Sequence, residues 1–373
     1  LNQKWKYHYF NSFNIAFVSD WNGSYNIFNV SYEFSEYSID KVRLGDLIYD
    51  LYIRKNFSFI NPKALSFKFF HLLFSSIYKF LFIRNFFNKN KIKYSLIGSV
   101  TYISVSSIIL RISQKKNIPV IYVSGESYKI IKKGTFIGDI ISDFLKEKLN
   151  LENQKKLLKL SEKYFKNRIK GKLSVKNFNP KLYFQHDEQT WKINNSNNAF
   201  LKKISKIKKN YSHVILYAPH NFAESNHGCG DLIFRDFYQQ TKQTLEFAKK
   251  KENILWLFKI HPYSQKKYGE LKITKDLLKV FKNKNIHLVP SKTSNERLFK
   301  IVDLVVSTRG TICLEAATFG LKNLINSNVY FYNGNISIKA KSKNDYFRML
   351  INIKSYKKIK SDTVKKAKKI LYL

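Results

Sequence analysis

Sulfur-containing residues are scarce in this chain. Its 373 residues include two cysteines, Cys229 and Cys313, and a single methionine, Met349. The cysteines form no Cys-x-x-Cys pair, so we expect no disulfide framework and favour a reducing compartment. Because the chain begins at Leu1 and not at methionine, we expect its natural amino terminus to lie upstream, and the lack of a signal peptide excludes little.

Two glycine motifs that identify common enzyme classes are also missing. The chain has 13 glycines, and they form neither a Gly-x-Gly-x-x-Gly dinucleotide fingerprint nor a Walker A phosphate loop. These absences argue against simple dehydrogenases, kinases and nucleoside triphosphatases.

No hydrophobic run is long and uncharged enough to cross a membrane. The most apolar segment, 66–87, contains Lys68, His71, Lys79 and Arg84, whereas a spanning helix needs about 20 largely uncharged residues. We predict a helix there that packs in the core or against another subunit. The alternative is a helix lying in the membrane interface.

Acidic residues are few relative to basic ones. The chain has 67 Lys and Arg against 26 Asp and Glu, a formal net charge of +41. Only nine of the basic residues are arginine, and the excess of Lys, Asn, Ile, Phe and Tyr is what AT-rich coding produces whatever the function. We therefore expect no nucleic-acid partner. We expect instead attraction to anionic sugars or anionic lipid, which distributed positive charge favours without a specific code.

Strand-like apolar runs alternate with helix-like stretches, which is typical of an α/β protein. In the first half, 14–20 is predicted to be a strand and 94–125 a strand–helix–strand unit. From 140 to 210 the sequence is lysine-rich and helical and then polar, and we place the linker there. The elements predicted after it are strands at 213–220, 253–260, 286–290, 302–308 and 321–327, and helices at 232–251, 275–284, 294–301 and 312–320.

This pattern predicts three regions. An amino-terminal domain with a helical insert and linker covers 1–205, a doubly wound domain covers 206–340, and a helical tail covers 341–373. Two such domains face to face would form a cleft, which suits a two-substrate transfer reaction.

Polar residues gather where three predicted strands of the second domain end. If the sheet is parallel, all three loops leave from one edge, where open α/β sheets bind ligands. Imidazoles, a guanidinium, hydroxyls and the amides of a helix start would together suit a phosphate. The residues are His220, Glu224, His227, Gly228 and Gly230 after the first strand; Lys259, His261 and Pro262 after the second; and Ser307, Thr308, Arg309, Gly310, Thr311 and Glu315 after the fourth.

Each of these features also has a structural interpretation. The Ser-Thr-Arg-Gly-Thr segment could be a helix cap with a tight turn, and Glu315 could only neutralise the start of its helix. The loop after the first strand could be a capping loop with Asp231 as the N-cap. His220, His227 and Cys229 are metal-ligand types, but no fourth ligand at a recognised spacing follows, so we expect no metal.

Several segments together resemble the bacterial capsule and surface polysaccharide synthesis family of glycosyltransferases, which includes the Kdo transferases. The segment 43–57, RLGDLIYDLYIRKNF, is similar to an amino-domain segment of that group. The resemblance implies the GT-B fold, in which two Rossmann-like domains face a central cleft and the carboxyl domain holds the nucleotide sugar. The other similar segments are HNFAESNHG at 220–228, LIFRDF at 232–237, FKIHP at 258–262 and STRGTICLEAATFG at 307–320.

The resemblance also implies roles for individual residues. His261 would contact phosphate, fixed by Pro262 and supported by Lys259. Glu315 would hold the ribose or the base. Ser307, Thr308 and Thr311 would bind phosphate oxygens through hydroxyls and helix-start amides, and Arg309, Gly310, His227 and Gly228 complete the predicted donor site.

The catalytic base stays open at this point. Asp46, in the GDLIYD segment, and Asp20, at a predicted strand end, are the candidates from the amino domain. His220 and Glu224 are candidates to orient the donor sugar or to assist proton transfer.

The predicted function is transfer of a sugar, such as Kdo or a related acidic sugar, from a nucleotide donor such as CMP-Kdo to a lipid-linked or polymeric glycan. No Asp-x-Asp pair stands in a strand-end loop, so a metal-dependent GT-A enzyme is disfavoured. We expect a cytoplasmic protein that associates peripherally with the anionic inner face of the membrane. Two alternatives stay open: a transferase of an alcohol phosphate from a CDP donor, and a non-catalytic carbohydrate-assembly protein.

Overall fold

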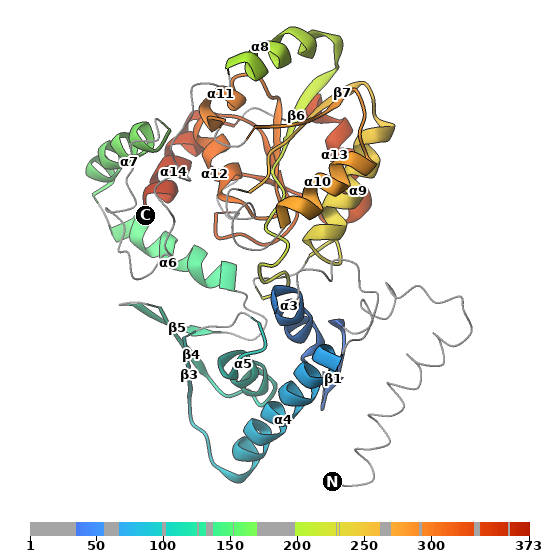
Figure 1. The fold of residues 1–373 in the computed structure, drawn as a ribbon. Coiled ribbons are helices and arrows are strands. Elements are labelled where there is room, and N and C mark those ends of the chain that lie inside the picture. Colours follow the sequence, from blue (N-terminus) through green and yellow to red (C-terminus); the bar gives the residue numbers. More distant parts are fainter. Residues whose placement is uncertain are drawn as a thin grey trace. The chain divides into compact units, whose positions relative to one another are not determined.

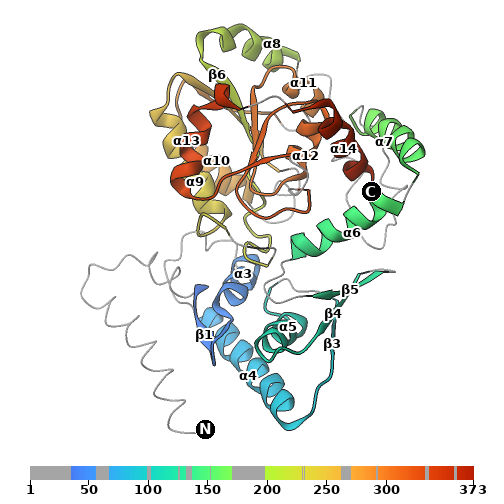
Figure 2. The same ribbon diagram turned by 180° about the vertical axis from the view of Figure 1, so that it is seen from behind.

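The chain divides into two compact units, Leu1–Thr135 and Phe136–Leu373, in this computed structural model (Figures 1 and 2). The division differs from the predicted boundary at 205/206, because helices α6 and α7 group with the second unit. The predicted strand at 14–20 lies outside the described residues. The structure describes residues 35–55, 67–98, 102–124, 127–131, 137–151, 153–169, 198–228, 230, 232–261, 270–290, 293–331, 336–356 and 359–373.

The carboxyl-terminal unit is built on a parallel six-stranded sheet. The chain enters at β6, adds β7 and β8 on one side, and then crosses back to add β9, β10 and β11 on the other. This is the doubly wound Rossmann order, with its topological switch point between β6 and β9. The predicted α/β fold is confirmed. In spatial order the strands are β11 (Ile338–Lys339), β10 (Asn323–Ile325), β9 (Leu304–Val306), β6 (His213–Tyr217), β7 (Ile254–Phe258) and β8 (Ile286–Leu288).

The central strands are apolar on both faces because helices cover both sides of the sheet. Val214 and Leu216 pack into one hydrophobic cluster with α11, α12 and α14. Ile215 and Tyr217 pack into the other with α9, α10 and α13, and Figures 1 and 2 show these two helical layers. The helices of this unit are α6 (Ile137–Leu151), α7 (Gln154–Ile169), α8 (Asn198–Ile207), α9 (Phe237–Lys250), α10 (Glu270–Val280), α11 (Asn295–Phe299), α12 (Thr311–Thr318), α13 (Lys343–Ile351) and α14 (Ser361–Tyr372).

Every predicted strand and helix after residue 212 is present, but some boundaries move. Helix α9 begins at Phe237 and not at 232, because the Asp236 side chain caps it by accepting a hydrogen bond from the Gln239 amide at 2.7 Å. Asp231 is therefore not the N-cap of this helix. The predicted helical tail forms α13 and α14, whose Tyr346 and Ile370 lie in the two clusters.

The amino-terminal unit contains the predicted strand–helix–strand module. Strands β3 and β4 are parallel and are joined by α5, and β5 pairs antiparallel with β4. Helix α5 starts with a capping box formed by Ser104 and Ser107. The elements of this unit are β1 (Ser38–Ile39), β2 (Val42–Arg43), α3 (Gly45–Lys55), α4 (Phe67–Lys89), β3 (Ser95–Ile97), α5 (Val105–Lys115), β4 (Val120–Ser124) and β5 (Ser127–Ile131).

The predicted helix at 66–87 is confirmed as α4, and it is buried along one side only. The buried stripe recurs every three or four residues, as expected for a helix face. Within the described parts of the chain, no helix is long and apolar enough to span a membrane. The stripe consists of Phe69, Leu73, Ile77, Phe80, Ile83 and Phe87, and the exposed large side chains are Phe74, Tyr78, Phe82 and Phe86.

We predict that Phe80→Ala destabilises the amino-terminal unit by about 3–5 kcal/mol, because removing a fully buried ring leaves a cavity. The matched control is Phe82→Ala on the same helix, whose ring is 66% exposed and whose loss should cost less than about 0.5 kcal/mol. Hydrogen exchange of the α4 amides, read by mass spectrometry, measures both. Equal protection in the two variants would show that this packing is wrong.

Candidate functional site

The site is set by three neighbouring strands that end together. Tyr217 of β6 lies opposite Phe258 of β7 and Val306 of β9. Because these strands are parallel, the segments that begin at Ala218, Lys259 and Ser307 leave from the same edge of the sheet. They do so at the switch point between β6 and β9.

His220 lies at the centre of this edge. Its ring stacks on Phe237 with centroids 4.7 Å apart, and it lies parallel to the ring of His261 at 6.4 Å. Its Nδ1 is 2.9 Å from Glu224 Oε2 and 3.0 Å from the Asn221 amide nitrogen. One ring nitrogen cannot donate to the carboxylate and accept from the amide at once. Nδ1 therefore either carries a hydrogen and donates it to Glu224, or is bare and accepts from the Asn221 amide.

The Glu224 carboxylate is held in its ionised form. Burial raises its pKa, but the charge and hydrogen bond of His220 and the charges of His261 and Arg309 outweigh this and lower the pKa to about 2. The side chain is 55% exposed, so the carboxylate is within reach of a ligand. The carboxylate and the His220 imidazole lie side by side, and groups of these two kinds can accept or donate a proton.

The start of helix α12 forms the second part of the site. Gly310 is the N-cap, and no side chain of the described residues caps the helix through a hydrogen bond. A Cβ atom on Gly310 would lie 2.6 Å from Ser307 Oγ, so only glycine fits this close approach. The uncapped amides and the helix dipole favour an anion here.

Ser307 and Thr308 are almost fully buried, at 2% and 1% exposure. The Ser307 hydroxyl donates to the Ala218 carbonyl at 2.8 Å, and the Thr308 hydroxyl donates to Gln240 Oε1 at 2.5 Å. Both hydroxyl hydrogens thus bond within the protein and fix the segment to β6 and α9. Their contact with phosphate oxygens stays a prediction, whereas Thr311 is exposed at the helix start.

Arg309 joins the loop after β6 to the segment after β9. Its guanidinium donates to the Asn226 carbonyl at 2.7 Å and to Ser327 Oγ at 3.0 Å, and it lies over the Phe237 ring at 5.3 Å from the centroid. Asn226 in turn accepts a hydrogen bond from the Phe237 amide at 2.9 Å through its side-chain oxygen. Arg309 therefore holds the His220 loop in place.

Lys259 supports Glu315 through Asn295. Its ammonium donates to the Thr293 carbonyl at 2.7 Å and also bonds Asn295 Oδ1, and Asn295 Nδ2 donates to Glu315 Oε2 at 2.7 Å. Burial lowers the Lys259 pKa to about 8, while the Glu315 charge acts in the opposite direction. Lys259 thus helps to orient Glu315, and its predicted support of His261 stays a prediction.

Three of the remaining predicted residues form hydrogen bonds within the loop that follows β6. The Gly228 amide donates to Ser225 Oγ at 3.2 Å, and the His227 carbonyl accepts from the Gly230 amide at 3.3 Å. Gly230 has φ of 134°, a conformation that favours glycine. Asp20, Pro262, Cys229 and Asp231 lie outside the described residues.

Asp46 belongs to the amino-terminal unit. Both of its carboxylate oxygens accept from Arg111, at 2.6 and 2.7 Å, and the residue is 4% exposed. These are the contacts of a buried structural ion pair. Its role as catalytic base stays a prediction.

Sequence reasoning missed several residues that hold the site together: Asn221, Asn226, Phe237, Gln240, Glu270 and Asn295. Glu270, for example, accepts from the Ala223 amide at 2.8 Å across 47 residues of sequence. Polar residues in a loop or helix carry no sequence signal for such distant partners. The one available signal is the presence of Asn221 and Asn226 close to His220, since asparagine side chains often bond the backbone of a loop.

Comparisons with models of known protein families and with curated proteins found no match. Solved structures similar to this chain include the KpsC beta Kdo 2,4 transferase of Thermosulfurimonas dismutans, with 12% identity, coverage of 74% of this chain and 78% of that chain, and a TM-score of 0.37. The KpsC beta Kdo 2,7 transferase of the same organism has 11% identity, coverage of 77% and 78%, and a TM-score of 0.37. The UDP-GlcNAc 2-epimerase of Neisseria meningitidis has 14% identity, coverage of 79% and 75%, and a TM-score of 0.32.

We predict that His220→Gln raises the Glu224 pKa from about 2 towards the ordinary value of about 4.3, because the positive charge of His220, the largest cause that lowers it, is lost. Carboxyl ¹³C NMR titration measures the midpoint directly. Asp345, whose pKa is lowered by a bond from the Lys341 amide, is the control and should not move. An unchanged Glu224 midpoint would show that His220 is not its partner.

Proposed function

We propose that this protein is a glycosyltransferase that binds a nucleotide sugar at the carboxyl edge of β6, β7 and β9. The observation that supports this most directly is the gathering of His220, His261 and the uncapped start of α12 at the switch point. Open α/β sheets bind nucleotides in the crevice at this point. A phosphate there would meet helix amides and imidazoles together.

In this proposal the donor is held by its two ends. The amides of the α12 start, the Thr311 hydroxyl and the exposed His261 ring bind the phosphates. The Glu315 carboxylate, oriented by Asn295 and Lys259, accepts hydrogen bonds from the ribose hydroxyls. Arg309 acts indirectly, by positioning the loop that carries His220.

The chemistry requires no group beyond these. An acceptor hydroxyl attacks the anomeric carbon, the bond from that carbon to the phosphate oxygen breaks, and its electron pair leaves with the nucleotide. The helix amides and His261 stabilise the developing negative charge. His220, with Glu224 beside it at the carboxyl edge of the sheet, takes the acceptor proton.

The donor sugar is proposed to be Kdo or a related acidic sugar, and the acceptor a lipid-linked or polymeric glycan. The large positive charge of the chain supports anionic substrates. Transfer of an alcohol phosphate from a CDP donor and a non-catalytic carbohydrate-assembly role are the rivals. Incubation with CMP-Kdo, UDP-GlcNAc, GDP-mannose and CDP-glycerol, each with acceptor, separates the three when nucleotide release is followed.

We predict that Gly310→Ala weakens binding of the released nucleotide by about ten-fold, because moving the helix start weakens an interaction worth up to about 2 kcal/mol. The clash with Ser307 Oγ at 2.6 Å causes the movement. Gly98→Ala is the matched control, since its Cβ would meet only the Val123 carbonyl, at 3.9 Å. Calorimetric titration with the nucleotide checks both variants, and equal affinities would remove α12 from the proposed site.

We also propose that the amino-terminal unit attaches to the anionic inner face of the cytoplasmic membrane through α4. Phe74, Tyr78, Phe82 and Phe86 recur at every fourth position and are 57%, 72%, 66% and 53% exposed. Aromatic rings of this kind favour the boundary between headgroups and acyl chains. Lysines on the same helix add attraction to anionic lipid.

Replacing Tyr78 and Phe82 together by serine should weaken binding to anionic vesicles, measured by flotation, by about thirty-fold, since each ring loses roughly 1 kcal/mol of apolar burial. High salt should weaken binding of the unchanged protein. The control replaces Tyr128 and Ile130, which are 73% and 61% exposed in the same unit. Vesicle binding that does not depend on lipid charge or salt would contradict this attachment. An equal loss of vesicle binding in the control variant would contradict the role of α4.

A further inference from the structure

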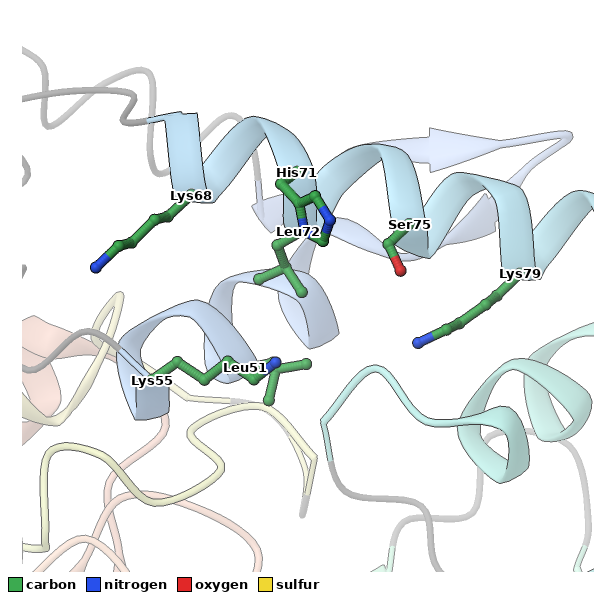
Figure 3. A pocket seen from close by; sticks show the side chains of 7 residues that line it. All are labelled: Leu51, Lys55, Lys68, His71, Leu72, Ser75 and Lys79. Atoms are coloured by element: carbon green, nitrogen blue, oxygen red, sulfur yellow. The ribbon is translucent and has the colours of Figure 1, made fainter.

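Helices α3 and α4 enclose a pocket of about 340 Å³ in the amino-terminal unit. Figure 3 shows it between the two helices, with Lys68 and Lys79 of α4 at its two ends. The volume lies at the lower end of the roughly 300–1,000 Å³ typical of ligand pockets. It would therefore hold a small ligand or one part of a longer molecule.

The lining of this pocket is cationic. Lys55, Lys68 and Lys79 contribute three ammonium groups and His71 contributes an imidazole, and no carboxylate is among the described residues that line the pocket. None of the three lysines forms an ion pair within the described parts of the chain. Like charges gathered around one pocket repel one another, and a bound anion would relieve this repulsion.

The spacing of the cations favours an extended ligand. Lys68 and Lys79 are 11 positions apart on α4, which corresponds to a rise of about 16 Å along the helix axis. Lys55 reaches the pocket from α3 on the opposite wall (Figure 3). One phosphate ion cannot contact groups so far apart, whereas a chain that carries charges at intervals can.

The rest of the lining suits a sugar. Leu51 and Leu72 provide apolar surface, and Ser75 lies between the lysines with a hydroxyl group (Figure 3). Sugars present both C–H faces and hydroxyls, which such mixed pockets match. We infer that the pocket binds part of an acidic sugar chain that carries carboxylate or phosphate groups. The sugar identity rests on the proposed function, but the charge and the length of the ligand do not.

The test uses the full chain and a fluorescent oligogalacturonate, which has a carboxylate on each sugar. We expect salt-sensitive binding of this probe, no binding of a neutral malto-oligosaccharide of equal length, and only weak competition by inorganic phosphate. Joint replacement of Lys55, Lys68 and Lys79 by glutamine should lower the affinity about ten-fold. The single variant Lys79→Glu is the second test, and it should also weaken binding.

The matched control replaces Lys89, Lys91 and Lys93 by glutamine, which removes the same charge from exposed positions of the same unit. It should keep its affinity within about two-fold if binding is local and not due to net charge. The inference would be overturned by equal losses of affinity in both triple variants, or by unchanged affinity in the pocket variants. It would also be overturned if the protein binds anionic vesicles but not oligogalacturonate. Nucleotide binding, measured in parallel, should be the same in all variants. If the unchanged protein binds no nucleotide, this result contradicts the proposed function but not the binding of an anionic chain in this pocket.

Discussion

Burial of β6, β7 and β9 on both faces is the constraint on which the rest of the carboxyl-terminal unit depends. Strands covered by helices on two sides can carry few polar side chains within their length, because a buried polar group needs a partner. The polar residues of this region are therefore confined to the positions where the strands end. Parallel pairing then brings those ends to one edge, so the chemistry of the site follows from the hydrophobicity of the sheet.

At that edge, hydrogen bonds between the loops fix the positions of the residues that follow the strands. Arg309 bonds the backbone of the His220 loop, Ser307 bonds Ala218, and Thr308 bonds Gln240 of α9. The segment after β9 thus serves mainly to hold the segment after β6. The hydroxyls of Ser307 and Thr308 and the guanidinium of Arg309 are thus occupied by contacts within the protein.

The sequence was a good guide wherever burial decided the structure. Runs such as ILWLF at 254–258 are apolar throughout and too short for a typical helix, which favours internal strands, so the sheet and its edge could be predicted. Loop contacts could not, because partners such as Ala223 and Glu270 are far apart in sequence and no periodicity links them. Residue types and the family resemblance assigned Ser307, Thr308 and Lys259 to the donor site, and these contacts stay predictions. The bonds of the three side chains within the protein could not be predicted, because they depend on three-dimensional neighbours.

The packing of α14 beside α7 has a consequence for how the carboxyl-terminal unit is assembled. Lys369 bonds Gln154 and Lys368 pairs with Glu162, across about 200 residues of chain, while Ile370 completes the cluster that also contains Val214. Contacts so distant in sequence form late, because the entropy of closing a long loop must be lost first. Helix α7 is therefore synthesised long before its partner exists, and during translation its apolar side must stay exposed or find temporary cover. The same adjacency places α7, the second helix of the unit, beside α14, its last, so that segments near the two ends of the unit lie close together, as is common in domains that tolerate circular permutation.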